Sequence, residues 1–267
     1  MTKFYLASDL HLEFGELKIE NKDNVDCLIL AGDVVEIDRL KKDGSAKIAH
    51  IKEFFDQINS DFDKVIWVPG NHEYYGCYFM QKSLGDARDW LSKNSFDNIQ
   101  LCDMETVMVK ETPVHCATLW TDMNRGNAFI AHQIQNAMND YKHIRGATPK
   151  RAGSRINAVE TQIIHSKHLD FLDRATRDEV ECVVVTHHQP TMAALSNQYA
   201  SDIDYAYASE LSEFFLDRPQ IQVWCSGHTH ASMQQIDIGD QRFLTNCRGY
   251  HGHEEIASFF EPMLFEV

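Results

Sequence analysis

Five short polar blocks along the chain each follow an apolar run with the length and composition of a buried strand. In an open α/β sheet, residues at the carboxyl ends of neighbouring strands meet in one crevice. The pattern therefore favours a fold that brings five distant strand ends together, with the ligand set that two adjacent divalent ions require. Seven side chains of metal-ligand type stand in the blocks: Asp9, His11, Asp33, Asn71, His187, His228 and His230.

The apolar runs alternate with stretches of helical periodicity, and this alternation predicts a layered α/β fold with a largely internal sheet. The predicted buried strands are Lys3–Ser8, Asp26–Ala31, Lys64–Val68, Val114–Leu119, Glu181–Thr186 and Gln222–Ser226. The predicted helices are Ala46–Ile58, Leu84–Leu91, Ile163–Ala175 and Tyr205–Leu216. Short strands are expected in the C-terminal third, at Gln234–Ile238, Arg242–Thr245 and Met263–Glu266.

A chain of 267 residues without a linker-like stretch is expected to form a single domain over residues 1–267. Residues 122–160 are the least strand-like part, with one helical stretch from Ala128 to Tyr141. We interpret this region as an insertion over the sheet edge. It is either a lid above the site or a surface excursion without function.

The formal charge of −15 argues against broad binding to nucleic-acid backbones, which requires a basic surface. No apolar stretch approaches the roughly 18 residues of a membrane helix, and the short apolar run after Lys3 fits a first strand better than a signal peptide. The seven scattered cysteines form no C-x-x-C pair. An odd number of cysteines in apolar runs favours reduced thiols, so we expect a cytoplasmic protein without membrane attachment.

The ligand types constrain the metal. Imidazole suits Zn, Fe and Ni, whereas carboxylate and amide oxygens also accept Mn, and a set without thiolate differs from a structural cysteine–zinc site. We therefore expect two divalent ions drawn from Mn, Fe, Zn, Co or Ni. An aspartate that bridges two ions brings them to about 3.5–4 Å, where they activate a water and hold phosphoryl oxygens.

The order D-x-H, G-D, G-N-H-[ED], H and G-H-x-H across residues 9–230 resembles that of the calcineurin-like metallophosphoesterases. The resemblance implies a four-layer α/β/β/α sandwich with the site at one edge. It also implies two ions that share one bridging ligand. The implied ligands are Asp9, His11 and His230 for one ion, Asn71, His187 and His228 for the other, and Asp33 for the bridge.

The same resemblance implies a catalytic role for His72, which would protonate or stabilise the leaving oxygen. The family often supports this histidine with the last residue of G-D-x-x-D, where this chain has Glu36. Arg248 lies in an N-C-R-G-Y segment that is similar to the N-P-R-G-Y of some members. A guanidinium there could hold a phosphate oxygen, or it could form a surface salt bridge. His165 and His168 lie on a polar helix face, and we expect them to be solvated.

These observations predict a metal-dependent phosphoester hydrolase. A histidine acid is most useful with a poor alkoxide leaving group, so a phosphodiesterase on a small or nucleotide-like substrate is favoured. A phosphomonoesterase, including a protein phosphatase, is the alternative enzyme. A non-catalytic scaffold of the same fold is disfavoured, because all seven ligand positions and His72 are filled.

Overall fold

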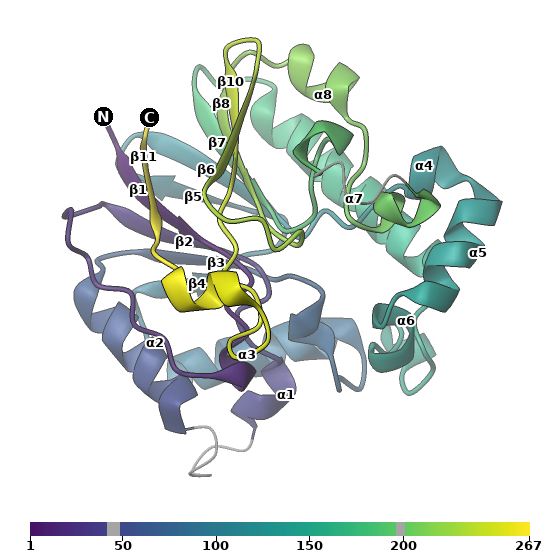
Figure 1. Cartoon of the computed structure of the whole chain (residues 1–267), viewed down its shortest axis with the longest axis horizontal. Helices are drawn as coiled ribbons and strands as arrows, with labels where there is room; N and C mark the ends of the chain where they lie inside the picture. Colours follow the sequence, from purple (N-terminus) through teal and green to yellow (C-terminus); the bar gives the residue numbers. More distant parts are fainter. Residues whose placement is uncertain (42–48, 196–200) are drawn as a thin grey trace.

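Two sheets form the centre of the protein (Figure 1), and the computed structural model describes residues 1–41, 49–195 and 201–267. The first sheet has the order β11-β1-β2-β3-β4, in which β1 to β4 run parallel and β11 pairs antiparallel with β1. Its strands are β1 (Lys3–Ala7), β2 (Cys27–Ala31), β3 (Val65–Val68), β4 (Ile99–Leu101) and β11 (Met263–Glu266). The pairing of β1 with β11 brings the two termini side by side.

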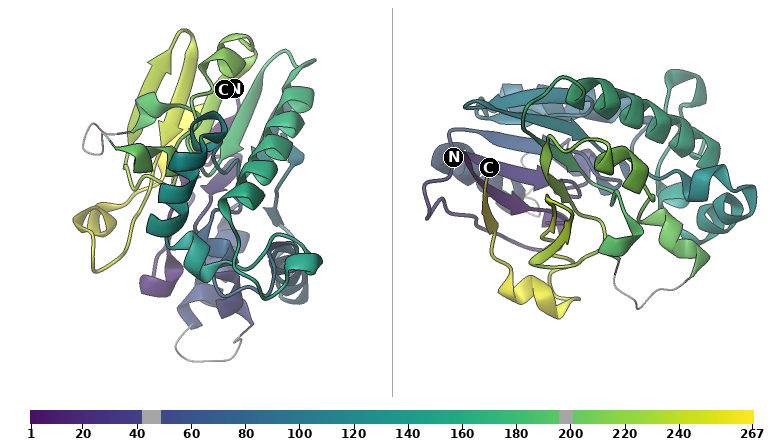
Figure 2. Two further views of the ribbon diagram at one scale, coloured as in Figure 1. Left: turned by 90° about the vertical axis from the view of Figure 1, so that its right-hand side faces the viewer. Right: turned by 90° about the horizontal axis from the view of Figure 1, so that it is seen from above.

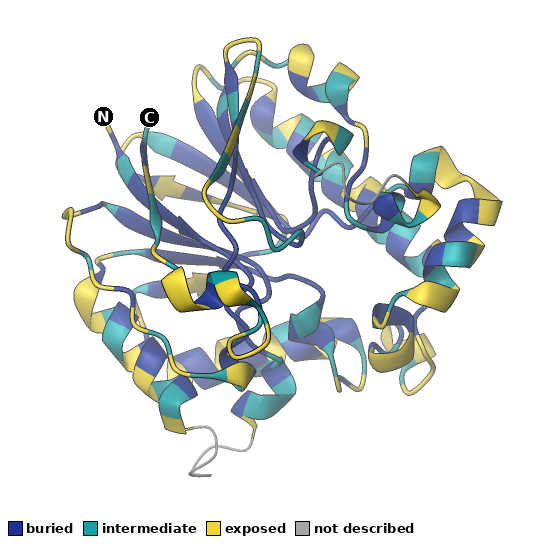
Figure 3. Ribbon diagram, viewed as in Figure 1, coloured by how far each residue is buried: buried dark blue, intermediate teal, exposed yellow. Residues whose placement is uncertain are grey.

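The second sheet has the order β5-β6-β7-β8-β10-β9, with a parallel centre from β6 to β10 and antiparallel strands at both edges. Its strands are β5 (Glu105–Val109), β6 (Thr112–Ala117), β7 (Cys182–Thr186), β8 (Ile221–Ser226), β9 (Gln234–Ile238) and β10 (Gln241–Thr245). The central strands are buried along almost their whole length (Figure 3), as expected for parallel strands covered on both faces.

Alternate residues of each strand point to different cores, which produces four layers. Ile29 of β2 and Val183 of β7 share a core between the two sheets. The other face of the first sheet packs under α2 (Ala49–Asp61) and α3 (Met80–Lys93), with Trp67 among the buried residues. The other face of the second sheet packs under α7 (Ala158–Thr176) and α8 (Ser212–Leu216), around Trp224. The expected α/β/β/α arrangement is confirmed.

The predicted strands are present, with β4 and β5 in addition. The run Val114–Leu119 ends early, because Leu119 and Trp120 turn into the left-handed region at φ 71° and 54°. The predicted helix Tyr205–Leu216 is instead a 3-10 segment, η7 (Asp202–Ala206), followed by α8. The backbone between them pairs with the loop after β7, since Ser209 N donates to Gln189 O at 3.1 Å. Residues 46–48 of the predicted first helix lie outside the described residues.

The region 122–160 forms three short helices that lie to one side of the sheets (Figures 1 and 2). They are α4 (Met123–Gly126), α5 (Ala128–Ala137) and α6 (Asp140–His143), and a 3-10 turn, Pro149–Arg151, follows before α7. Ile130, Ile134 and Tyr141 pack with Trp120 and Tyr74 in a separate small core. No helix in the described part of the chain combines the length and apolarity needed to cross a membrane.

Candidate metal centre

The turns after the strands place the predicted ligands under backbone strain. Five of the seven ligand-type residues have a positive φ, a conformation that is uncommon for residues other than glycine. Such strain persists only where the surrounding structure fixes it, and it clusters at functional sites. The five are Asp9 (φ 50°), His11 (φ 45°), Asp33 (φ 53°), His228 (φ 69°) and His230 (φ 52°).

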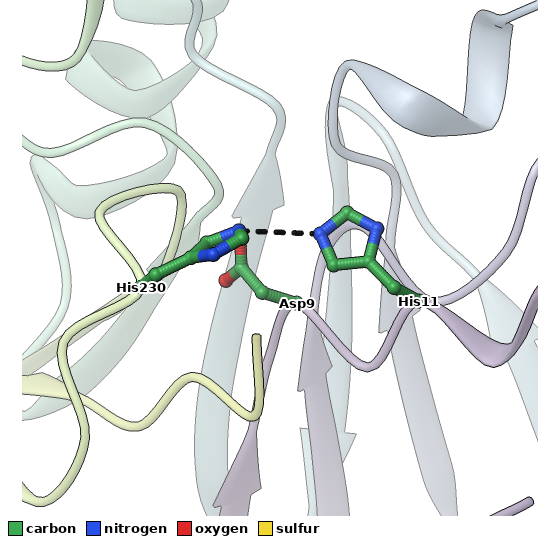
Figure 4. Close-up of side chains that lie close together, drawn as sticks. All are labelled: Asp9, His11 and His230. Carbon is green, nitrogen blue, oxygen red and sulfur yellow. Dashed lines mark hydrogen bonds and ion pairs between the residues drawn. The ribbon is translucent and has the colours of Figure 1, made fainter. Parts of the chain in front are cut away.

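The structure brings Asp9, His11 and His230 together as one group of potential ligands (Figure 4). The rings of His11 and His230 face each other with their Nε2 atoms 3.3 Å apart. The Asp9 Oδ1 atom lies 3.6 Å from His230 Nε2. The Asp9 carboxylate also accepts from the backbone N–H of His228, which ties the first group to the second.

Asp33, His187 and His228 form the second group, and Asn71 adjoins it. His187 Nε2 lies 2.9 Å from Asn71 Oδ1, 3.2 Å from His228 Nδ1 and 3.4 Å from Asp33 Oδ2. The same Asp33 oxygen lies 3.9 Å from Nε2 of His11, in the first group. One carboxylate oxygen therefore faces both groups.

The hydrogen bonds of the rings show that each group suits a cation. His187 Nδ1 lies 2.9 Å from the carbonyl oxygen of Ala31, so this nitrogen carries the proton and Nε2 presents a lone pair in the neutral ring. That lone pair faces an amide oxygen, a carboxylate and another imidazole. Electron-rich atoms gathered in this way require positive charge between them, so the residues present fit a metal ion.

His230 shows the same arrangement in the first group. Its Nδ1 lies 2.7 Å from a carboxylate oxygen of Glu254, which leaves Nε2 directed toward His11 and Asp9. His11 Nδ1 in turn lies 3.4 Å from Glu13 Oε1. A carboxylate behind a metal-binding histidine fixes the ring and raises its basicity.

The electrostatics of the second group favour bound positive charge. Burial alone would raise the pKa of Asp33, but the neighbouring histidines, His187 foremost, hold it well below its usual value. Burial lowers the pKa of His187, but Asp33 outweighs it and raises that pKa to about 10, so without an ion a proton on Nε2 supplies the positive charge that this group requires. Burial, with His188 and His187, holds the pKa of His228 well below its usual value. His228 is therefore a neutral ring with a free lone pair, as a metal ligand must be.

Glu73 fixes the two loops that carry Asp33 and Asn71. Its buried carboxylate accepts four N–H groups: Asp33 N at 3.0 Å, Val34 N at 2.7 Å, Gly70 N at 2.7 Å and Trp67 Nε1 at 3.0 Å. The loops after β2 and β3 are thereby joined through the same carboxylate. Glu73 positions the ligands without being one.

His72 lies beside the two groups, and its backbone N–H donates to Asp33 Oδ1 at 2.8 Å. Its Nε2 is 3.4 Å from the hydroxyl of Tyr250, and its ring stacks on Tyr75. The carboxylate near its Nδ1 belongs to Glu13, at 3.9 Å. Burial lowers the pKa of His72, but Asp33 and Glu13 raise it to about 9.

Glu36 does not take the place that the family pattern implied. Its carboxylate accepts from Arg39 Nε at 2.7 Å, one helical turn further along α1 (Ile37–Leu40). The side chain that reaches His72 comes from Glu13, two residues after His11.

Arg248 is neither a surface salt bridge nor directed at a phosphate. It is buried, and its guanidinium donates to the carbonyl oxygens of Leu10 (3.0 Å), Gly15 (3.2 Å) and Glu16 (2.6 Å). Its two terminal nitrogens hold the loop after β1 in place. The predicted substrate contact is therefore replaced by a structural role.

The second group opens into a cavity of about 430 Å³. Residues 137–140 of the predicted insertion form part of its wall, together with Tyr207 and Tyr250. Asp140 also fixes a ligand, since its Oδ1 accepts from Asn71 Nδ2 at 2.8 Å and from the Tyr75 hydroxyl at 2.7 Å.

Four supporting residues escaped the sequence analysis: Glu13, Glu73, Asp140 and Glu254. Glu13 and Glu73 adjoin motif residues, in D-L-H-L-E and G-N-H-E, so a search for carboxylates next to ligand histidines could have found them. Asp140 and Glu254 lie far from the motifs in sequence, and only the fold brings them in.

Two parallel-rich sheets with paired Asp/His clusters at their strand ends define a metal-dependent phosphoesterase fold with a dinuclear site. The chain belongs to the calcineurin-like phosphoesterase family, whose model matches residues 2–232. Members of this family use a dinuclear divalent metal site to hydrolyse phosphoesters, and the two clusters could bind those ions here. The protein is therefore a metal-dependent phosphoester hydrolase.

The chain is 28% identical to the uncharacterized protein L509 of Acanthamoeba polyphaga mimivirus, with 93% of this chain and 91% of that protein covered. Among solved structures it resembles a phosphopantetheinyl hydrolase from Mycobacterium tuberculosis, at a TM-score of 0.64 and 15% identity over 98% of this chain and 95% of that one. A dimetal phosphatase from Danio rerio is similar at a TM-score of 0.51 and 13% identity, over 91% and 86% of the two chains. These likenesses support the fold.

Proposed function

We propose that the protein is a phosphodiesterase that acts on a small or nucleotide-like substrate. The observation that carries the proposal is a second hollow of about 450 Å³, whose lining includes His72 but none of the seven ligand-type residues. His72, Tyr75, Asn139 and Tyr250 line both hollows. A phosphate held at the ions would therefore have space for an organic group on each side of His72, which suits a diester.

The residue roles follow from this placement. Asp9, His11 and His230 would hold one ion, Asn71, His187 and His228 the other, and Asp33 would bridge them. When bound, the ions would activate a water and neutralise phosphoryl oxygens. We prefer manganese or another metal that accepts mixed oxygen and nitrogen ligands.

His72 is proposed to protonate the departing oxygen. It lines the hollow that would receive the leaving group, and Glu13 lies 3.9 Å from its Nδ1. Tyr250 is placed to orient the Nε2 side of the ring. An acid matters most where the leaving alkoxide is basic.

Residues 122–160 are proposed to act as a wall of the substrate site within a single domain, because residues 137–140 line the cavity and Asp140 holds Asn71. A cytoplasmic location remains our proposal. It is supported by the seven cysteines, all of which are buried free thiols.

The test compares a diester with a monoester in the presence of Mn²⁺. We expect bis(p-nitrophenyl) phosphate to be hydrolysed with a higher kcat/KM than p-nitrophenyl phosphate. His72→Ala should keep both ions and lose about 10²–10⁴-fold on an alkyl leaving group, but far less on p-nitrophenol. A preference for the monoester would favour the phosphatase alternative, and an equal loss on all leaving groups would refute the acid role.

A further inference from the structure

We propose that this site selects phosphodiesters whose only negative charge is the phosphate itself, and that it rejects substrates carrying a second anionic group. The inference rests on the proposed diesterase function and defines the chemical class of its substrate. It arises from the charges on the walls of the two hollows beside His72.

The walls carry carboxylates in addition to the metal ligands. Asp140, Asp204 and Glu254 line the hollow at the ions. Glu36 lines the second hollow, where Arg39 neutralises its charge, so the excess of carboxylates lies at the first hollow. Among the described residues that line either hollow there is no lysine or arginine. A second phosphate or a carboxylate on the substrate would face like charge in a partly enclosed space, where water screens charge poorly.

Arg248, which follows the last histidine motif along the chain, cannot compensate. Arg248 is 1% exposed, and three backbone carbonyl oxygens occupy its guanidinium. Among the described residues that line the first hollow, positive charge is therefore confined to the metal groups and His72. An uncharged or basic organic group is compatible with every other part of the walls.

Asp204 is the wall carboxylate best suited to a test. It lies in η7, and its own capping contacts hold it: Ser201 N donates to Oδ2 at 3.2 Å and Ser201 Oγ to Oδ1 at 3.4 Å. An asparagine can accept from the Ser201 N–H and donate to the Ser201 hydroxyl, so Asp204→Asn removes charge and keeps the cap. Asp202→Asn is the matched control, because Asp202 is an exposed residue of the same segment outside the lining.

The assay uses three diesters that share p-nitrophenol as the leaving group and differ only in the retained group. These are the ethyl ester (neutral), the choline ester (cationic) and the 2-carboxyethyl ester (anionic). We expect kcat/KM for the anionic ester to be at least about tenfold below that of the other two, and the gap to shrink with added salt. Asp204→Asn should narrow the gap about threefold, whereas Asp202→Asn should leave it unchanged.

Comparable kcat/KM values for the anionic and neutral esters in the wild-type enzyme would overturn the inference, even if Asp204→Asn failed to fold. Equal effects of the two substitutions would also overturn it, because they would show a charge effect that is not specific to the wall. Failure of the proposed function is distinct: all three diesters would then resist hydrolysis while p-nitrophenyl phosphate was cleaved.

Discussion

The network at Glu73 predicts a large effect from a nearly isosteric change. Oε1 accepts from Val34 N and Trp67 Nε1, and Oε2 accepts from Asp33 N and Gly70 N. In Glu73→Gln, one of these oxygens becomes an NH₂ group. In either orientation of the amide, its NH₂ group replaces an oxygen that accepted two N–H groups. Those two donors then lose their acceptor and face the hydrogens of the amide.

The cost follows from the two donors left unpaired in a fully buried place. An unsatisfied buried donor costs about 1–3 kcal/mol, so the substitution should lower the free energy of unfolding by about 4 kcal/mol. For a chain of this size that corresponds to a fall in Tm of about 8–16 °C. Asp33 and Asn71 lie on the loops released, so metal content should fall as well.

Urea unfolding and elemental analysis of Glu73→Gln would check both effects. Glu36→Gln is the control, because Glu36 is a partly exposed partner of Arg39 and its loss should cost no more than about 1 kcal/mol. If the two variants lost the same stability and bound the same metal, the carboxylate would not be holding the loops, and the reasoning would be refuted.

Three further perturbations test other parts of the structure. Arg248→Lys should lose about 1–3 kcal/mol of stability with little change in KM, since a single ammonium nitrogen cannot occupy the positions of both terminal guanidinium nitrogens that contact the three carbonyls. A raised KM at unchanged Tm would instead support a contact between Arg248 and the substrate. Asp33→Asn should abolish binding of the ion pair, and two ions at full activity, measured by elemental analysis and turnover, would contradict the bridge. Burial lowers the pKa of His115 to about 4. Between about pH 6.5 and 4, the unfolded chain therefore binds a proton on this histidine that the folded protein does not bind. The free energy of unfolding should fall by about 1–3 kcal/mol as the pH drops through that window. Urea unfolding of His115→Gln should show a smaller loss of stability between pH 7 and 5 than the wild-type protein shows. An identical loss in the two proteins would assign the acid sensitivity to other groups.

The strands could be predicted because burial on both faces leaves a continuous apolar signature. Cys182–Thr186 and Ile221–Ser226 are apolar over almost their whole length. β4 and β5 gave a weaker signal, since β4 has three residues and β5 alternates buried with exposed ones. Their pairing depends on neighbours that a local pattern does not contain.

The histidines of α7 show how a polar face can mislead. His165 and His168 were expected in solvent, but both are buried. Leu119 has left the strand with a positive φ, and its backbone groups need partners. His168 Nδ1 accepts from Leu119 N at 3.0 Å, and His165 Nδ1 donates to Leu119 O at 3.1 Å. The sequence contains both histidines, but only the fold supplies the unpaired backbone that they serve.

The metal ligands could be predicted from the sequence and their supporting carboxylates could not, and the reason is geometric. A strand end dictates where the next one or two side chains lie, so residue type and spacing identify ligands such as Asp9 and Asp33. A supporting carboxylate needs only to reach its histidine from any nearby segment. Glu36 begins a helix whose next turn presents Arg39, and that cation draws its carboxylate away. Glu13 lies in the tight 3-10 turn after His11, which returns it beneath the rings of His11 and His72.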